Sequence, residues 1–138
     1  MDDLKLADFP LITFDKVRYV DTDCQGHVNN SAFSTFLETG RVEFLYNKDF
    51  KLLNDGASFV IASLNLKFLN EIVWPGTIDI GTGIVNIGSS SVKIFQQLYQ
   101  NEKCVASAET IIVQTKNNKS VPLNDSAKEI LKQWLIKA

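Results

Sequence analysis

The segment Asp21-Thr22-Asp23-Cys24-Gln25-Gly26-His27-Val28-Asn29-Asn30 is the most informative part of this sequence. It places the only histidine of the chain beside two acids, two asparagines and a glycine. β-Forming residues precede it, and residues with helical spacing follow it. At such strand-to-helix junctions, the free N–H groups of the first helical turn can stabilise negative charge. A carboxylate four residues before a histidine is therefore a candidate base or nucleophile.

The residues on either side of this segment predict a strand and a helix. β-Formers concentrated from Leu11 to Val20 predict a first strand, and residues 21–29 predict a loop. Asn30 to about Tyr46 predicts a helix with Asn29 as its N-cap. One apolar stripe at helical spacing supports it: Phe33, Phe36, Leu37, Gly40, Phe44 and Leu45. A glycine within a helix costs roughly 1 kcal/mol relative to alanine, so Gly40 predicts a close approach of another backbone, as when a sheet wraps the helix.

The second half of the chain is rich in β-formers. Four strands are predicted, at residues 58–69, 76–87, 91–100 and 103–116. Short turns at Gly88-Ser89-Ser90 and Gln100-Asn101-Glu102 indicate antiparallel neighbours. A final short helix is predicted from Ser126, where Ser126 and Glu129 have capping-box spacing. This order of elements is α+β, and by itself it fits several folds.

A family resemblance selects among those folds. The block continues as Ser31-Ala32-Phe33-Ser34-Thr35-Phe36-Leu37-Glu38-Thr39-Gly40-Arg41. With the preceding residues it resembles the acyl thioesterases of the 4-hydroxybenzoyl-CoA thioesterase type. Their pattern is Asp-x-x-x-His-Val-Asn-Asn, two aromatics three apart, then Glu-x-x-Arg. The resemblance covers roughly residues 12–116 and is specific over residues 18–41. It implies the hot-dog fold, in which a curved antiparallel sheet wraps a central helix. The length of the chain suits one such domain, over residues 1–138.

The resemblance assigns the catalytic carboxylate to Asp23. A carboxylate can activate water as a general base, or attack the thioester itself and form a mixed anhydride. The sequence leaves both routes open. In an extended loop Asp21 and Asp23 point the same way, and only the distance to His27 in the family pattern favours Asp23. The structural alternative is that both acids cap turns or the helix.

The resemblance also suggests roles for the neighbouring residues. His27 is expected to orient the thioester, protonate the leaving sulfur or position Asp23; alternatively, its ring is packed and bonded to backbone. At Asn30 the backbone N–H of the first helical turn is expected to polarise the thioester carbonyl. Four further residues are expected to contact substrate: Gln25, Gly26, Val28 and Asn29. Gln25 stands where related plant acyl-carrier-protein thioesterases have Asn, and Gly26 allows positive φ or close approach of substrate.

The helix residues of the motif have a structural interpretation. Phe33 and Phe36 stand where many relatives have Tyr, and their stripe spacing predicts that they belong to the core. Glu38 and Arg41 match Glu-x-x-Arg and are expected to form an intrahelical pair that contributes a few tenths of a kcal/mol.

Two rival chemistries are less favoured. Cys24 and His27 could form a thiol–histidine pair, but no third orienting group is evident. Asp21, Asp23 and His27 could bind a metal, but a stable site usually needs three or four protein ligands and there is no further histidine. We therefore expect neither a metal nor an organic cofactor, with coenzyme A present only as part of the substrate.

Composition limits the remaining functions. Hydrophobic residues make up 45% and charged residues 22% of 138 residues, with a formal net charge of -2. This balance gives no reason to expect nucleic acid or an anionic membrane as partner. No signal peptide and no apolar run long enough to cross a bilayer are evident. Cys24 and Cys104 are expected to be reduced thiols, and the protein is expected to be cytoplasmic.

The sequence therefore predicts a thioesterase that hydrolyses an acyl-CoA or acyl-carrier-protein thioester. The resemblance implies a homodimer, or a homotetramer built as a dimer of dimers, paired sheet edge to sheet edge. The acyl site would then lie between two copies, and the candidates for the second copy's polar contribution are Ser58, Ser63 and Asn65. The alternatives are a non-catalytic acyl-binding or assembly module and a hydratase on the same fold.

Overall fold

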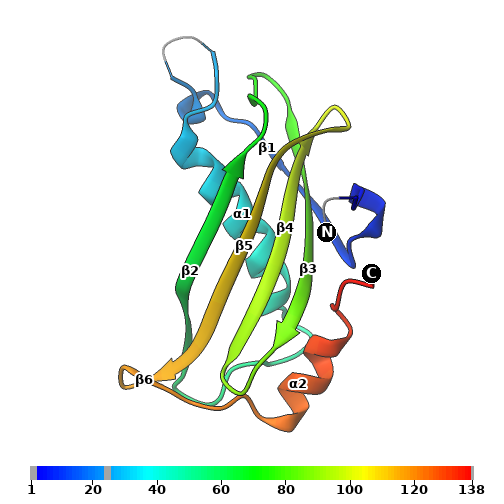
Figure 1. Cartoon of the computed structure of the whole chain (residues 1–138). Helices are drawn as coiled ribbons and strands as arrows, with labels where there is room; N and C mark the ends of the chain where they lie inside the picture. The colour runs from blue at the N-terminus through cyan, green and yellow to red at the C-terminus, as the bar shows by residue number, and fades with distance from the viewer. Residues whose placement is uncertain (1–2, 24–25, 138) are drawn as a thin grey trace.

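The computed structural model describes residues 3–23 and 26–137, which form a curled antiparallel sheet against a long helix (Figure 1). Within this part of the chain, the sheet order is β1-β3-β4-β5-β2, with the short β6 paired to β5. The elements are β1 (Leu11–Lys16), α1 (Asn30–Leu45), β2 (Ser58–Phe68), β3 (Thr77–Ile87), β4 (Ser91–Gln100), β5 (Lys103–Lys116), β6 (Lys119–Ser120) and α2 (Asp125–Lys132). The predicted α+β hot-dog architecture is confirmed.

Strands β3, β4 and β5 form a meander joined by tight turns. All their pairings are antiparallel, as the short connections predicted. The β4–β5 turn has positive φ at Asn101 (51°) and Glu102 (68°), the conformation of a two-residue hairpin whose twist matches that of the strands. Strand β2 pairs with β5 instead of a neighbour in sequence, and it forms one edge of the sheet.

Helix α1 packs its apolar stripe on one face of the sheet and runs behind the strands in the view of Figure 1. Phe36 and Leu37 are fully buried, as predicted, among sheet residues that include Ile80 and Leu98. A Cβ on Gly40 would lie 2.6 Å from Thr82 Oγ1 and 2.7 Å from Ile80 Cγ2. The sheet therefore approaches Gly40 closely, but through its side chains and not through a backbone as predicted.

The predicted N-terminus of the central helix is confirmed, but two other predicted boundaries are wrong. Asn29 caps α1, and its side-chain oxygen accepts from the Ser31 N–H at 3.3 Å. The first strand ends at Lys16, because the following residues turn into a short 3-10 helix at Tyr19–Asp21. Helix α2 begins at Asp125 and is capped by Asn124, whose side-chain oxygen accepts from the Ala127 N–H at 2.7 Å. Ser126 is thus inside the helix.

The expected intrahelical pair of Glu38 and Arg41 is not formed. No ion pair joins these two residues in the described structure, and Arg41 is buried. Its guanidinium donates to Gln96 Oε1 on β4 at 3.4 Å. Burial lowers the pKa of Arg41, and the negative charge of Glu38 partly opposes that effect. Arg41 therefore contributes to the polar contact between helix and sheet.

Neither α1 nor any other helix within residues 3–23 and 26–137 has the length and apolar character needed to cross a membrane.

Candidate active site

The candidate site is built on the loop between the Tyr19–Asp21 turn and α1. Its two sides are joined by a β-bridge between Thr22 and Val28. The Asp23 N–H donates to the His27 carbonyl at 2.8 Å, and the His27 N–H donates to Asp23 Oδ1 at 3.3 Å. Gly26 has a φ of 82°, the positive φ that was one of the two roles expected of this glycine. This backbone pairing holds Asp23 and His27 side by side at the base of the loop.

A second segment, which follows β2, lies against this loop. Val73 forms an antiparallel bridge with His27, and the Val28 N–H donates to the Ile72 carbonyl at 2.9 Å. The pairing brings Glu71 to the histidine ring, with 3.4 Å between Glu71 Oε2 and His27 Nε2. His27 thus has one acid, Asp23, bonded to its backbone N–H and another, Glu71, beside its imidazole ring.

These groups face a cavity of about 370 Å³. Its lining residues are Asp23, His27, Val28, Asn30, Phe33, Phe68, Leu69, Asn70 and Glu71. The rings of Phe33 and Phe68 meet edge to face with 5.0 Å between their centroids. Phe33 is 3% exposed, so it belongs to the core as predicted and also lines this cavity. The cavity therefore combines polar groups from the motif with an aromatic wall.

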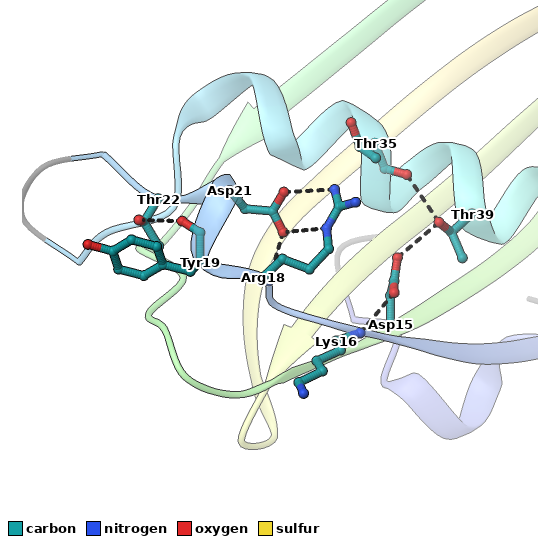
Figure 2. A network of polar contacts seen from close by, with 8 residues as sticks. All are labelled: Asp15, Lys16, Arg18, Tyr19, Asp21, Thr22, Thr35 and Thr39. Carbon is teal, nitrogen blue, oxygen red and sulfur yellow. Dashed lines mark hydrogen bonds and ion pairs between the residues drawn. The ribbon is translucent and has the colours of Figure 1, made fainter.

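Asp21, two residues before Asp23, has its carboxylate against the guanidinium of Arg18 (Figure 2). It is 6% exposed, and its Oδ1 accepts from Arg18 Nη2 at 2.8 Å while its Oδ2 accepts from Arg18 Nε at 3.2 Å. Oδ2 also accepts from the Arg18 backbone N–H at 2.9 Å. Burial alone would raise the pKa of Asp21, but the hydrogen bonds and charge of Arg18 hold this pKa below its ordinary value. Asp21 is a structural carboxylate that fixes the turn before the loop.

The start of α1 reaches the same cavity through Asn30, the first helical residue. The N–H groups of a first helical turn have no acceptor within the helix. Asn29 is not among the lining residues; its side chain caps the helix, and its N–H donates to the Asp21 carbonyl at 2.7 Å. The buried turn at Asp21 thereby anchors the helix terminus beside Asp23.

The remaining candidates have different placements. Of the four predicted substrate contacts, Val28 lines the cavity and Gly26 forms the loop turn, whereas Gln25 lies outside the described residues. Cys24 also lies outside them. Burial raises the pKa of Cys104, which does not line the candidate cavity. Within residues 3–23 and 26–137, no three His, Cys, Asp or Glu side chains are grouped closely enough to hold a metal.

Sequence reasoning did not find the contribution of Phe68, Asn70 and Glu71. The available signal was the polar pair Asn70-Glu71 between apolar residues just before a Pro-Gly turn. That pattern indicates a loop, but it does not show which other segment the loop lies against. A larger cavity, of about 890 Å³, lies between the N-terminal segment and the sheet, and its lining includes Leu4, Phe95 and Tyr99 but no histidine. It therefore lacks the acid–histidine arrangement of the smaller one.

Known proteins share both the sequence pattern and the fold. A family model described as "Thioesterase-like superfamily" matches residues 17–135. The chain is 29% identical over 84 residues to the acyl-CoA thioesterase YbgC of Helicobacter pylori, a match that covers 61% of this chain and 63% of that protein. A thioesterase from Thermus thermophilus in complex with coenzyme A and Zn superposes with a TM-score of 0.82 at 23% identity, covering 95% of this chain and 98% of that one. A DHNA-CoA thioesterase from Staphylococcus aureus gives a TM-score of 0.77 at 16% identity, with 88% of each chain covered.

Proposed function

The chain belongs to the thioesterase-like superfamily and is a thioester hydrolase, and we propose that its substrate is an acyl-CoA, hydrolysed to a free acid and coenzyme A. One observation carries the assignment of the site. The Asp23 carboxylate, the His27 ring and the first residue of α1 line a single cavity with an aromatic wall. This combination provides a base or nucleophile, an electrophilic donor and an apolar surface for an acyl group.

The mechanism begins with the carbonyl oxygen at the N-terminus of α1. The Asn30 N–H donates to this oxygen as negative charge develops, and such a donor stabilises a transition state by ~3 kcal/mol. Asp23 then takes a proton from water as the water oxygen bonds to the carbonyl carbon, or its own oxygen bonds there and water later cleaves the anhydride. In both routes the carbon–sulfur bond breaks and the thiol departs.

The leaving sulfur accepts a proton from His27 in this proposal. Glu71 lies 3.4 Å from His27 Nε2, where its carboxylate can orient the imidazole ring. Both side chains are partly exposed, so the pair is screened by solvent until substrate covers the cavity. We assign Glu71 the role of orienting His27.

Hydrolysis on this scheme needs no metal or organic cofactor, because Asp23 and the helix terminus supply the base and the electrophile. Activity that survives dialysis against a chelator would support this part of the proposal. Metal-dependent recovery of activity would contradict it.

A second copy of the chain is expected to complete the site. β2 is an edge strand, and Val60, Ile61 and Leu64 on it are exposed. Phe68, at its end, is 51% exposed although it lines the cavity. Antiparallel pairing of two β2 edges would satisfy their free backbone groups and cover these side chains, with two equivalent sites. Ser58, Ser63 and Asn65 are exposed on the same strand and are candidates for contact with the partner's substrate.

The function is tested with short, long and aromatic acyl-CoAs and a thiol-detecting dye, with acyl-carrier-protein thioesters in parallel. We expect thiol release from at least one acyl-CoA, and loss of that release in Asp23→Asn. Faster release from the carrier-protein thioesters would reassign the carrier. Binding without any release would favour the non-catalytic module.

A further inference from the structure

Gln100, the last residue of β4, is buried at the end of the sheet that carries the candidate site. It is 6% exposed, and its side-chain amide makes two hydrogen bonds to one residue. Oε1 accepts from the Val73 N–H at 3.0 Å, and Nε2 donates to the Val73 carbonyl at 2.9 Å. The side chain thus binds Val73 as the backbone of a neighbouring strand would.

Val73 connects this amide to the candidate site. Its backbone forms the antiparallel bridge with His27, and the flanking residues add the bond from Val28 N–H to the Ile72 carbonyl. On the other side, the Trp74 N–H donates to the Gly26 carbonyl at 3.3 Å. A continuous series of hydrogen bonds therefore runs from the end of β4, through residues 72–74, to the loop that carries Asp23 and His27.

The surroundings of Gln100 restrict where its amide can lie. Gln100 pairs with Lys103 across the two-residue turn, which fixes its backbone. A Cβ added to Gly76 would lie only 2.7 Å from Gln100 Nε2, so the chain after Val73 wraps closely around the amide. The amide has both a donor and an acceptor at a fixed distance, and Val73 requires one of each.

We propose that Gln100 is a positioning residue for thioester hydrolysis. It holds residues 71–73 in register with residues 26–28, so that the Glu71 carboxylate reaches the His27 ring. This inference rests on the proposed function, because its consequence is the placement of the groups that act on the thioester. It assigns Gln100 no contact with substrate.

The chain offers a matched control at the opposite end of the sheet. Gln114 on β5 is fully buried, its Nε2 donates to the Val121 and Pro122 carbonyls, and its Oε1 accepts from the Asn54 N–H at 2.7 Å. It ties together two loops that do not line the candidate cavity. Gln100→Leu and Gln114→Leu therefore remove the same chemistry from two different places.

Both variants should melt at a lower temperature, but only one should change catalysis. For Gln100→Leu we expect kcat to fall by about 10-fold to 100-fold with KM within about twofold, since small misplacements of catalytic groups have such effects. Gln114→Leu should keep kcat, measured well below its melting temperature. Unchanged kcat in Gln100→Leu, or an equal loss in Gln114→Leu, would overturn the proposal.

Amide hydrogen exchange separates this inference from the proposed function. Gln100→Leu should accelerate exchange at Val28 and Trp74, and Gln114→Leu should do so at Asn54 instead. Unchanged exchange at Val28 and Trp74 in Gln100→Leu would overturn the positioning role, whatever the activity. Suppose instead that Gln100→Leu accelerates exchange at Val28 and Trp74, but the wild-type protein cleaves no acyl thioester. The role of Gln100 in holding these residues would then stand, and the proposed thioesterase function would be wrong. If Gln100→Leu does not fold, Gln100→Asn keeps the amide but withdraws it by one methylene, and the same outcomes apply.

Discussion

Asp21 and Asp23 stand two positions apart, but their carboxylates have different surroundings. Asp21 is buried against Arg18, whereas Asp23 faces the cavity beside His27. An arginine partner that donates from both side chain and backbone satisfies Asp21 within its own turn. The two acids can therefore be tested separately by the same substitution.

Asp23→Asn should lower turnover by at least ~100-fold, the lower range of what acid–base catalysis contributes. The melting temperature should change little, because an asparagine oxygen can still accept from the His27 N–H. Steady-state kinetics and thermal denaturation measure the two effects. A larger loss of turnover in Asp21→Asn than in Asp23→Asn would reverse the assignment of the catalytic acid.

Asp21→Asn should instead lower stability in a pH-dependent way. The pKa of Asp21 is lower in the folded protein, so its charge stabilises the fold above the ordinary carboxyl pKa, about 3.9. That contribution is lost as the pH falls through the lowered pKa. The difference in melting temperature between wild type and variant should therefore be present near neutral pH and shrink below about pH 4. A difference that grows on acidification would contradict the assigned contacts.

The sequence identified the motif but not all of the site, for a physical reason. Asp23, His27 and Asn30 are close in sequence, and local pattern was enough to group them. Glu71 joins them only through the pairing of residues 72–74 with residues 26–28, and no local property of either segment specifies that pairing. Asp21 was ambiguous because its partner, Arg18, depends on a turn that propensity did not predict.

Among the elements, α1 was the most predictable because its apolar stripe is long and regular. The end of β1 was not, since Val17, Tyr19 and Val20 are good β-formers. The chain turns there because Asp21 bonds back to Arg18. The cap of α2 was misassigned for another reason: Asn124 and Ser126 are both favourable cap residues, and local sequence does not choose between them.

Gly40→Ala tests the contact between helix and sheet. Alanine should stabilise an isolated helix by ~1 kcal/mol, but here its Cβ would lie 2.7 Å from the buried Gln96 Nε2, which donates to the Leu37 carbonyl. Overpacking of this kind costs about 1–3 kcal/mol, so we expect a net loss of stability in denaturant titrations. Glu38→Ala, at an exposed position of the same helix, should change stability by no more than about 0.5 kcal/mol. A stabilised Gly40→Ala would show that the sheet yields to the added methyl.

At the scale of the whole molecule, the exposed edge strand β2 predicts that two copies of the chain pair along it. Leu64→Lys should prevent two β2 edges from pairing, since a lysine at an edge opposes strand addition. We expect a monomer by light scattering and reduced activity, because Phe68 and the cavity lose their cover. Val42→Lys on α1 is the control, since Val42 and Leu64 are 40% and 39% exposed. If the wild-type protein were monomeric and fully active, the proposal that two copies share the site would be wrong.

The strand order β1-β3-β4-β5-β2 also has a consequence for how the chain folds during its synthesis on the ribosome. β1, α1 and β2 are synthesised first, yet β1 pairs only with β3, and β2 only with β5, within the described part of the chain. These earlier segments, together with the loop that carries Asp23 and His27, therefore emerge with their apolar surfaces uncovered and with no sheet on which to fold. The β3–β4–β5 meander has the shortest loops to close and provides the template on which the earlier segments dock. The segment that carries Asp23 and His27 is thus translated before the strands on which it docks, and it is among the last to be ordered.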